Sequence, residues 1–103
     1  GMVRIALDRA RIGDFCRRWG VSELAVFGSA VREDFGPGSD LDVLVSPAPG
    51  VVWSLLRLTD MRDELASIVG RPVDLVVRRA VERSPNWIRR REILESAETV
   101  YAA

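Results

Sequence analysis

Two short apolar runs in this chain are interrupted by aspartate, although both otherwise have the composition of buried strands. Asp40 to Ser46 reads DLDVLVS, and Pro72 to Val77 reads PVDLVV. Aliphatic and β-branched residues favour strands, whereas a carboxylate on a buried strand loses solvation unless a positive charge lies beside it. Because side chains alternate between the two faces of a strand, Asp40 and Asp42 should share one face. The sequence therefore predicts a sheet that carries carboxylates on one of its faces.

The rest of the chain alternates between helical and extended patterns. The expected elements are a helix from Ile5 to Trp19 ended by Gly20, a strand from Glu23 to Gly28, a helical turn from Ser29 to Asp34, a loop from Phe35 to Ser39, a helix from Val52 to Val69 ended by Gly70, and a helical tail from Val81 to Tyr101 with a break at Ser84-Pro85. This order predicts an α/β (α+β) fold in which helices flank a small sheet. We expect one domain, residues 2–103, because Gly1 before Met2 is typical of a residue left by tag removal.

The charged and polar residues exclude several kinds of site. Fifteen basic residues balance fifteen acidic ones, so we expect no direct binding to nucleic acid. The chain has no histidine, which excludes histidine bases and His-ligated zinc, and all its basic residues are arginine, which excludes a Walker-type lysine. No apolar run is long enough for a membrane span, so no membrane partner is expected. The lone Cys16 cannot form an internal disulfide, which favours a cytoplasmic location.

The aspartates themselves indicate a metal site. Two neighbouring carboxylates repel each other, and a divalent cation between them would remove that repulsion. Oxygen ligands without histidine or cysteine favour Mg²⁺ or Mn²⁺. If the strand of Asp74 lies beside that of Asp42, three carboxylates meet at one edge of the sheet and can hold two ions about 3.5–4 Å apart. The alternative is that Asp40, Asp42 and Asp74 are ordinary turn or surface residues.

The Gly28-Ser29 pair lies upstream, where a strand is expected to end. Backbone amides at such a turn can bind phosphate, Ser29 adds a hydroxyl, and Arg32 adds a guanidinium one turn later. The alternatives are a common Gly-Ser turn and an ion pair of Arg32 with Glu33 or Asp34.

Together these residues carry a resemblance to a known family. GSAVREDFGPGSDLDVLV, from Gly28 to Val45, resembles the Gly-Ser, ten-residue gap, Asp-x-Asp signature of the polymerase-beta-like nucleotidyltransferases, and Asp74 matches their third carboxylate. The short chain resembles the minimal nucleotidyltransferase (MNT) branch. One departure is Glu33, where the family often has glycine.

The resemblance implies a small mixed sheet flanked by helices and a site for ATP or another nucleoside triphosphate. It implies two Mg²⁺ ions, or Mn²⁺, held by the catalytic residues Asp40, Asp42 and Asp74, and a nucleotide bound by Gly28, Ser29, Arg32 and Ser39. Asp40 and Asp42 would bridge both metals, and Asp74 would hold the catalytic metal and help deprotonate the acceptor hydroxyl.

MNT proteins are commonly antitoxins that transfer AMP from ATP to a tyrosine of a HEPN-type toxin, so the resemblance implies such a partner. Two alternatives stay open: an antitoxin that acts by contact alone, and a small-molecule nucleotidyltransferase whose substrate-binding part is another chain. The short length disfavours the second. The tail is locally basic, and its arginines either form a solvated helix surface or contact an acidic partner or nucleotide phosphates. Trp53 and Trp87 are expected in the core rather than stacked on adenine.

Overall fold

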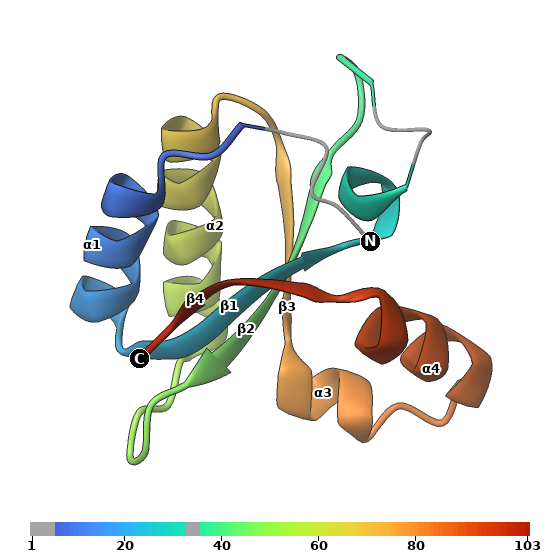
Figure 1. Cartoon of the computed structure of the whole chain (residues 1–103). Coiled ribbons are helices and arrows are strands. Elements are labelled where there is room, and N and C mark those ends of the chain that lie inside the picture. Colours follow the sequence, from blue (N-terminus) through green and yellow to red (C-terminus); the bar gives the residue numbers. More distant parts are fainter. Residues whose placement is uncertain (1–5, 33–35) are drawn as a thin grey trace.

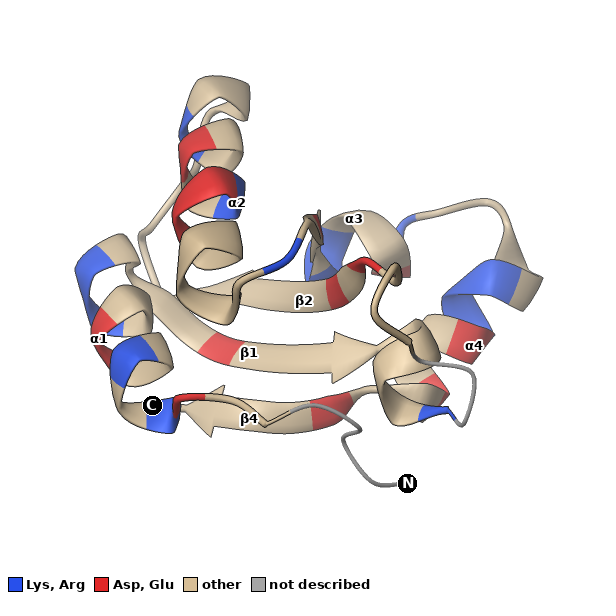
Figure 2. Ribbon diagram, turned by 90° about the horizontal axis from the view of Figure 1, so that it is seen from above, with Lys and Arg blue, Asp and Glu red and all other residues tan. Residues whose placement is uncertain are grey.

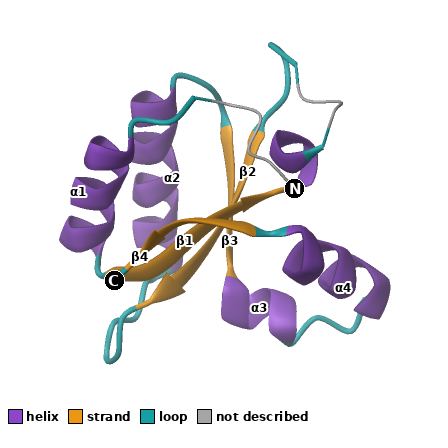
Figure 3. Cartoon of the chain, in the orientation of Figure 1, coloured by secondary structure: helices purple, strands orange, loops and turns teal. Residues whose placement is uncertain are grey.

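The fold is built on a four-stranded mixed sheet with helices on both of its faces (Figure 1; Figure 3). The computed structural model describes residues 6–32 and 36–103. Its elements are α1 (Arg9–Trp19), β1 (Val21–Phe27), the 3-10 helix η1 (Gly28–Val31), β2 (Leu41–Pro47), α2 (Leu55–Val69), β3 (Val73–Val77), α3 (Arg78–Glu82), α4 (Trp87–Ser96) and β4 (Glu98–Ala102).

The strands lie in the order β3-β2-β1-β4. β1 pairs antiparallel with both β2 and β4, whereas β3 pairs parallel with β2. Parallel neighbours need a crossover connection, and α2 supplies it between β2 and β3. The predicted mixed sheet flanked by helices is therefore confirmed.

The two faces of the sheet pack against different helix pairs (Figure 1). On one face α1 and α2 cover the larger core, which includes Phe15, Val26, Val43, Met61 and Leu65. On the other face α3 and α4 cover a smaller apolar cluster of Ala25, Phe27, Leu44, Val81 and Ile93. Alternate residues of β2 thus enter different cores, as the period of a strand requires.

The two longest helices end at the glycines predicted to stop them. Gly20 and Gly70 have φ values of 71° and 74°, a left-handed conformation that glycine adopts without a steric penalty. At the other ends, the side chains of Asp8 and Ser54 accept hydrogen bonds from backbone N–H groups in the first turn. These caps explain why α2 begins three residues after the predicted Val52.

The predicted helical tail is wrong at its end. α3 and α4 are separated near Ser84-Pro85 as expected, but the chain then becomes the strand β4, which pairs with β1. The segment ETVYA contains two β-branched residues and a tyrosine, which suit a strand, and Val100 is buried against the larger core. Trp87 was expected in the core but is 59% exposed on α4, whereas Trp53 is half-buried and donates from Nε1 to the carbonyl of Trp19.

Four positions of the predicted elements lie outside the described residues: Ile5, Glu33, Asp34 and Phe35. Among the helices of the described ranges, none has the length and apolar character needed to cross a bilayer. Acidic and basic residues both occur along α1 and α2 (Figure 2).

Candidate active site

The pairing of β2 with β3 sets two aspartates side by side. Asp42 is the register partner of Asp74 in this parallel pair, so both side chains leave the same face of the sheet. Asp40 directly precedes β2, and its charge acts on the Asp42 carboxylate. The structure therefore gathers the three predicted aspartates around the start of β2.

Asp42 is the carboxylate most affected by this arrangement. Burial raises its pKa above the ordinary value of 3.8, and the negative charges of Asp74 and then Asp40 raise it further. Arg32 and Arg89 act in the opposite direction and lower it. The net shift of the pKa is upward, so the folded protein disfavours the unneutralised charge of the Asp42 carboxylate.

Gly28 lies directly against this carboxylate. It follows Phe27, the register partner of Asp42, and has a φ of 65°. A Cβ built on Gly28 would collide with Oδ2 of Asp42, so no other residue fits without displacing the carboxylate. Glycine is therefore required here both for its conformation and for the close approach of the η1 backbone to Asp42.

An open pocket of about 310 Å³ lies beside Gly28 and Asp42. One wall consists of Phe27, Gly28, Arg32 and Asp42. The other wall belongs to α4, which packs near η1 and contributes Arg89, Glu92, Ile93 and Ser96. The pocket thus joins the end of β1, the start of β2 and a helix from the far end of the chain.

The sequence predicted only part of this pocket. Gly28, Arg32 and Asp42 are brought together, whereas Ser29 is half-buried beside them and accepts the Arg32 backbone N–H through its carbonyl at 3.1 Å. Ser39 is not one of the described residues that line the pocket. Its hydroxyl accepts the Gly36 N–H at 3.1 Å and closes a turn.

The α4 residues of the pocket were not predicted as site residues. The sequence showed that the tail is basic, but hydrophobic periodicity does not reveal which distant strand a helix covers. The only available signal was the spacing of Arg89, Glu92, Ile93 and Ser96, which places them on one side of a helix.

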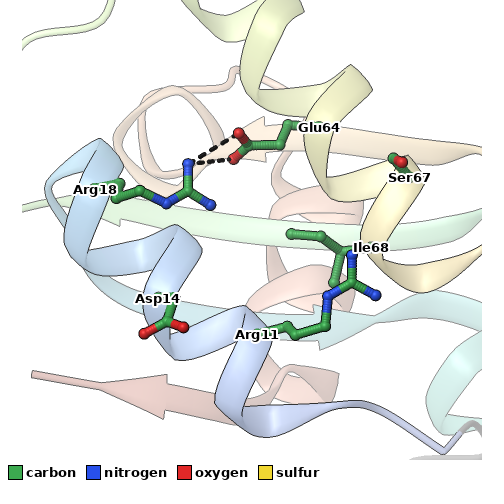
Figure 4. A pocket seen from close by; sticks show the side chains of 6 residues that line it. All are labelled: Arg11, Asp14, Arg18, Glu64, Ser67 and Ile68. Carbon is green, nitrogen blue, oxygen red and sulfur yellow. Dashed lines mark hydrogen bonds and ion pairs between the residues drawn. The ribbon is translucent and has the colours of Figure 1, made fainter.

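A second hollow lies between α1 and α2, on the opposite face of the sheet from Asp42 (Figure 4). Arg18 of α1 reaches across to Glu64 of α2, with Nη1 at 2.9 Å from Oε1. Glu64 also accepts the Nε1–H of Trp19 at 2.8 Å, and these contacts lower the pKa of its carboxyl. Arg18 and Glu64 are already paired with each other across this hollow, which indicates an inter-helix contact rather than a reactive centre.

The aspartates offer the oxygen ligands that Mg²⁺ and Mn²⁺ prefer. Within residues 6–32 and 36–103, no three acidic, histidine or cysteine side chains are close enough to enclose a cation by themselves. Mg²⁺ commonly completes its shell with water and substrate phosphates rather than with protein atoms alone. The donor set at the start of β2 therefore fits a cation that binds together with a phosphorylated ligand.

The sequence profile of a family described as "Nucleotidyltransferase domain" matches residues 10–100, most of the chain. The chain belongs to the nucleotidyltransferase domain family.

Similarity to known proteins shows which branch of this family the chain resembles. Protein adenylyltransferase MntA of Thermococcus cleftensis is 37% identical over 65 residues, which cover 63% of this chain and 64% of that protein, slightly less than two thirds of its length. A solved structure provisionally assigned as a minimal nucleotidyltransferase is 31% identical, with a TM-score of 0.66 over 87% of this chain and 86% of that chain. The predicted resemblance to MNT proteins is confirmed.

A third similarity concerns the fold alone. The chain superposes on a chain of the complex between a tri-AMPylated Shewanella oneidensis HEPN toxin and an MNT antitoxin. The TM-score is 0.62 at 18% identity, over 92% of this chain and 70% of that chain. The nucleotidyltransferase fold predicted from the Gly-Ser and Asp-x-Asp segment is confirmed.

A Gly28→Ala substitution tests the contact between η1 and β2. Alanine in the left-handed region costs about 1–2 kcal/mol, and the added collision with Asp42 should increase that cost. Gly70→Ala is the matched control, because Gly70 has a similar φ of 74° but open space around its Cβ position. In urea unfolding, Gly28→Ala should lower the free energy of unfolding more than Gly70→Ala does. In an Asp42→Ala background, where the colliding carboxylate is absent, the loss caused by Gly28→Ala should fall to that of Gly70→Ala. If Gly28→Ala lowers the free energy of unfolding equally with Asp42 present and with Asp42→Ala, the contact between Gly28 and Asp42 is contradicted.

The raised pKa of Asp42 predicts a pH dependence of stability. The folded protein binds this proton more tightly than the unfolded chain, so the stabilisation is complete below pH 3.8 and is lost as pH rises through the raised pKa. In EDTA, Asp42→Asn should therefore increase the free energy of unfolding at pH 7, and the gain should disappear below pH 3.8. Asp60→Asn, on the exposed side of α2, is the control. If it raises the free energy of unfolding at pH 7 as much as Asp42→Asn does, the gain does not come from the raised pKa of Asp42.

Proposed function

We propose that this chain is a metal-dependent nucleotidyltransferase that moves AMP from ATP to a hydroxyl of a protein partner. The observation that carries the proposal is the register of Asp42 with Asp74 in the parallel pair β2-β3, opposite the close approach of Gly28. This places carboxylates beside a backbone turn suited to phosphate, the combination that nucleotidyl transfer requires. We take residues 2–103 as one domain for this activity.

Asp40, Asp42 and Asp74 are the proposed ligands of two Mg²⁺ ions, for which Mn²⁺ could substitute. When bound, these ions would neutralise phosphate charge and lower the pKa of the acceptor hydroxyl. The strand register places Asp42 beside Asp74, and its carboxylate lies directly beside the Gly28 turn. Asp74 is exposed next to it and is the carboxylate best placed to orient an incoming hydroxyl.

Gly28, Ser29 and Arg32 are the proposed nucleotide-binding residues on the β1 side of the pocket. η1 has no side-chain cap at its start, so its first backbone N–H groups can donate to phosphate oxygens. The Arg32 guanidinium lines the same pocket and can bind two phosphate oxygens at once. Ser39 is the fourth proposed nucleotide-binding residue: its hydroxyl accepts the Gly36 N–H in the turn before Asp40, and its own O–H remains available to donate to a phosphate.

The proposed acceptor is a HEPN-type toxin, which would make this chain an antitoxin. Support comes from the 37% identity to a protein adenylyltransferase and from the fold shared with the MNT–HEPN complex. The pocket of about 310 Å³ is at the lower end of the size of small-ligand sites and leaves little room for a second small substrate beside a nucleotide, so a protein that brings its own recognition surface is favoured. A cytoplasmic location is proposed for this pair, in agreement with the single, buried Cys16 thiol.

The transfer is tested by mixing the protein with the product of a neighbouring HEPN-like gene, Mg²⁺ and labelled ATP, and weighing the partner by mass spectrometry. Wild-type protein should add one or more AMP groups and release pyrophosphate. Asp42→Asn, which has nearly the same shape, should reduce the rate by at least about 100-fold because it removes a metal ligand. Asp60→Asn on α2 is the control and should leave the rate unchanged.

A contact-only antitoxin would give a different result. Asp42→Asn would then neutralise the toxin as well as wild type, with no adduct on the partner in either reaction. That outcome would overturn the enzymatic proposal and retain the partner.

A further inference from the structure

α4 carries three consecutive arginines in different environments. Arg90 donates from Nη1 to the carbonyl of Ser84 at 2.6 Å, and Arg91 pairs through Nε with Glu95 at 3.1 Å. Within the described ranges 6–32 and 36–103, the guanidinium of Arg89 has no hydrogen-bond or ion-pair partner. The side chains of Arg90 and Arg91 are therefore engaged within α4 and the loop before it, whereas the N–H donors of the Arg89 guanidinium remain available.

The position of Arg89 directs those donors into the candidate site. Its side chain lines the pocket shared by Gly28, Arg32 and Asp42, and its charge acts on the Asp42 carboxylate. The helix start is fixed, because the Asn86 side chain accepts the Arg89 backbone N–H at 3.1 Å. Two arginines from elements far apart in the sequence thus flank the same carboxylate.

A phosphate chain fits this arrangement better than the acidic surface of a protein does. The pocket is concave and holds about 310 Å³, the lower end of the size of small-ligand sites. A phosphate bound through a cation at Asp42 would lie in the positive electrostatic field of both Arg32 and Arg89. A guanidinium binds phosphate through paired N–H donors, and one beside the Asp42 carboxylate, without a protein partner among the described residues, is suited to a polyphosphate that binds together with a cation.

We propose that Arg89 binds the phosphate chain of the nucleotide from α4, on the opposite side of the pocket from the Gly28 turn. This proposal rests on the proposed function, because it requires a nucleotide at the aspartates. It makes the C-terminal helix part of the nucleotide site. Leaving-group pyrophosphate would share the contact, since its oxygens belong to the same chain.

The test is calorimetric titration of the whole chain with ATP and with inorganic tripolyphosphate, each with Mg²⁺. Arg89→Gln should lower both affinities about tenfold, because it removes charged hydrogen bonds to phosphate. Arg91→Gln is the matched control: it removes the same charge from the same helix at a side chain that is 68% exposed and paired with Glu95. It should change either affinity less than twofold. Thermal melts should show both variants folded.

The outcomes separate this proposal from the proposed function. If wild-type protein binds neither ligand, the nucleotide site itself is wrong. If wild type binds both and Arg89→Gln binds them equally well, only the role of Arg89 is overturned. An equal loss in Arg91→Gln would also overturn it, since the effect would then be general charge. A variant that keeps ATP affinity but loses toxin binding would instead assign Arg89 to the protein interface.

Discussion

The parallel pairing of β2 with β3 is the interaction on which the rest of the site depends. Its register sets Asp42 beside Asp74, and a slip of one residue would turn Asp74 to the opposite face, where Leu75 packs into the larger core. The α2 crossover makes this pairing possible, and its buried Met61 and Leu65 hold it against the sheet. The apolar core on one face therefore fixes the positions of the charges on the other.

The sheet face that carries the aspartates is apolar along one part of the strands and acidic along the other. Under α3 and α4 it is apolar, with Leu44 and Val76 in the smaller cluster, whereas Asp42 and Asp74 lie two residues earlier on the same strands. β4 returns the chain to the far side of β1, so α4 comes near η1 and brings Arg89 toward Asp42. The repulsion among the carboxylates is offset in part by arginines, and a cation bound with phosphates would complete the balance.

Sequence reasoning predicted the strands and the carboxylates because their signals are local. Asp42 interrupts a run whose period is that of a strand, and Gly28 ends another, so both could be placed before the fold was known. β4 was missed because only Ala97 separates it from α4, with no glycine or proline to mark the end of the helix, and its short strand-forming segment is extended by pairing with β1. The sequence left Arg89, like the other tail arginines, between a solvated surface and a contact with an acidic partner or nucleotide phosphates, because its nearness to Asp42 is a long-range property of the topology.

The central claim, that these strand aspartates hold a divalent cation together with a nucleotide, is tested most directly by anomalous diffraction. Crystals grown with Mn²⁺ and a non-hydrolysable ATP analogue would be measured at the manganese edge. Manganese peaks within bonding distance of Asp42 and Asp74 carboxylate oxygens, and in contact with the phosphates, are the predicted result. Bound nucleotide with manganese elsewhere, or with Asp74 turned away from the metal, would contradict the claim.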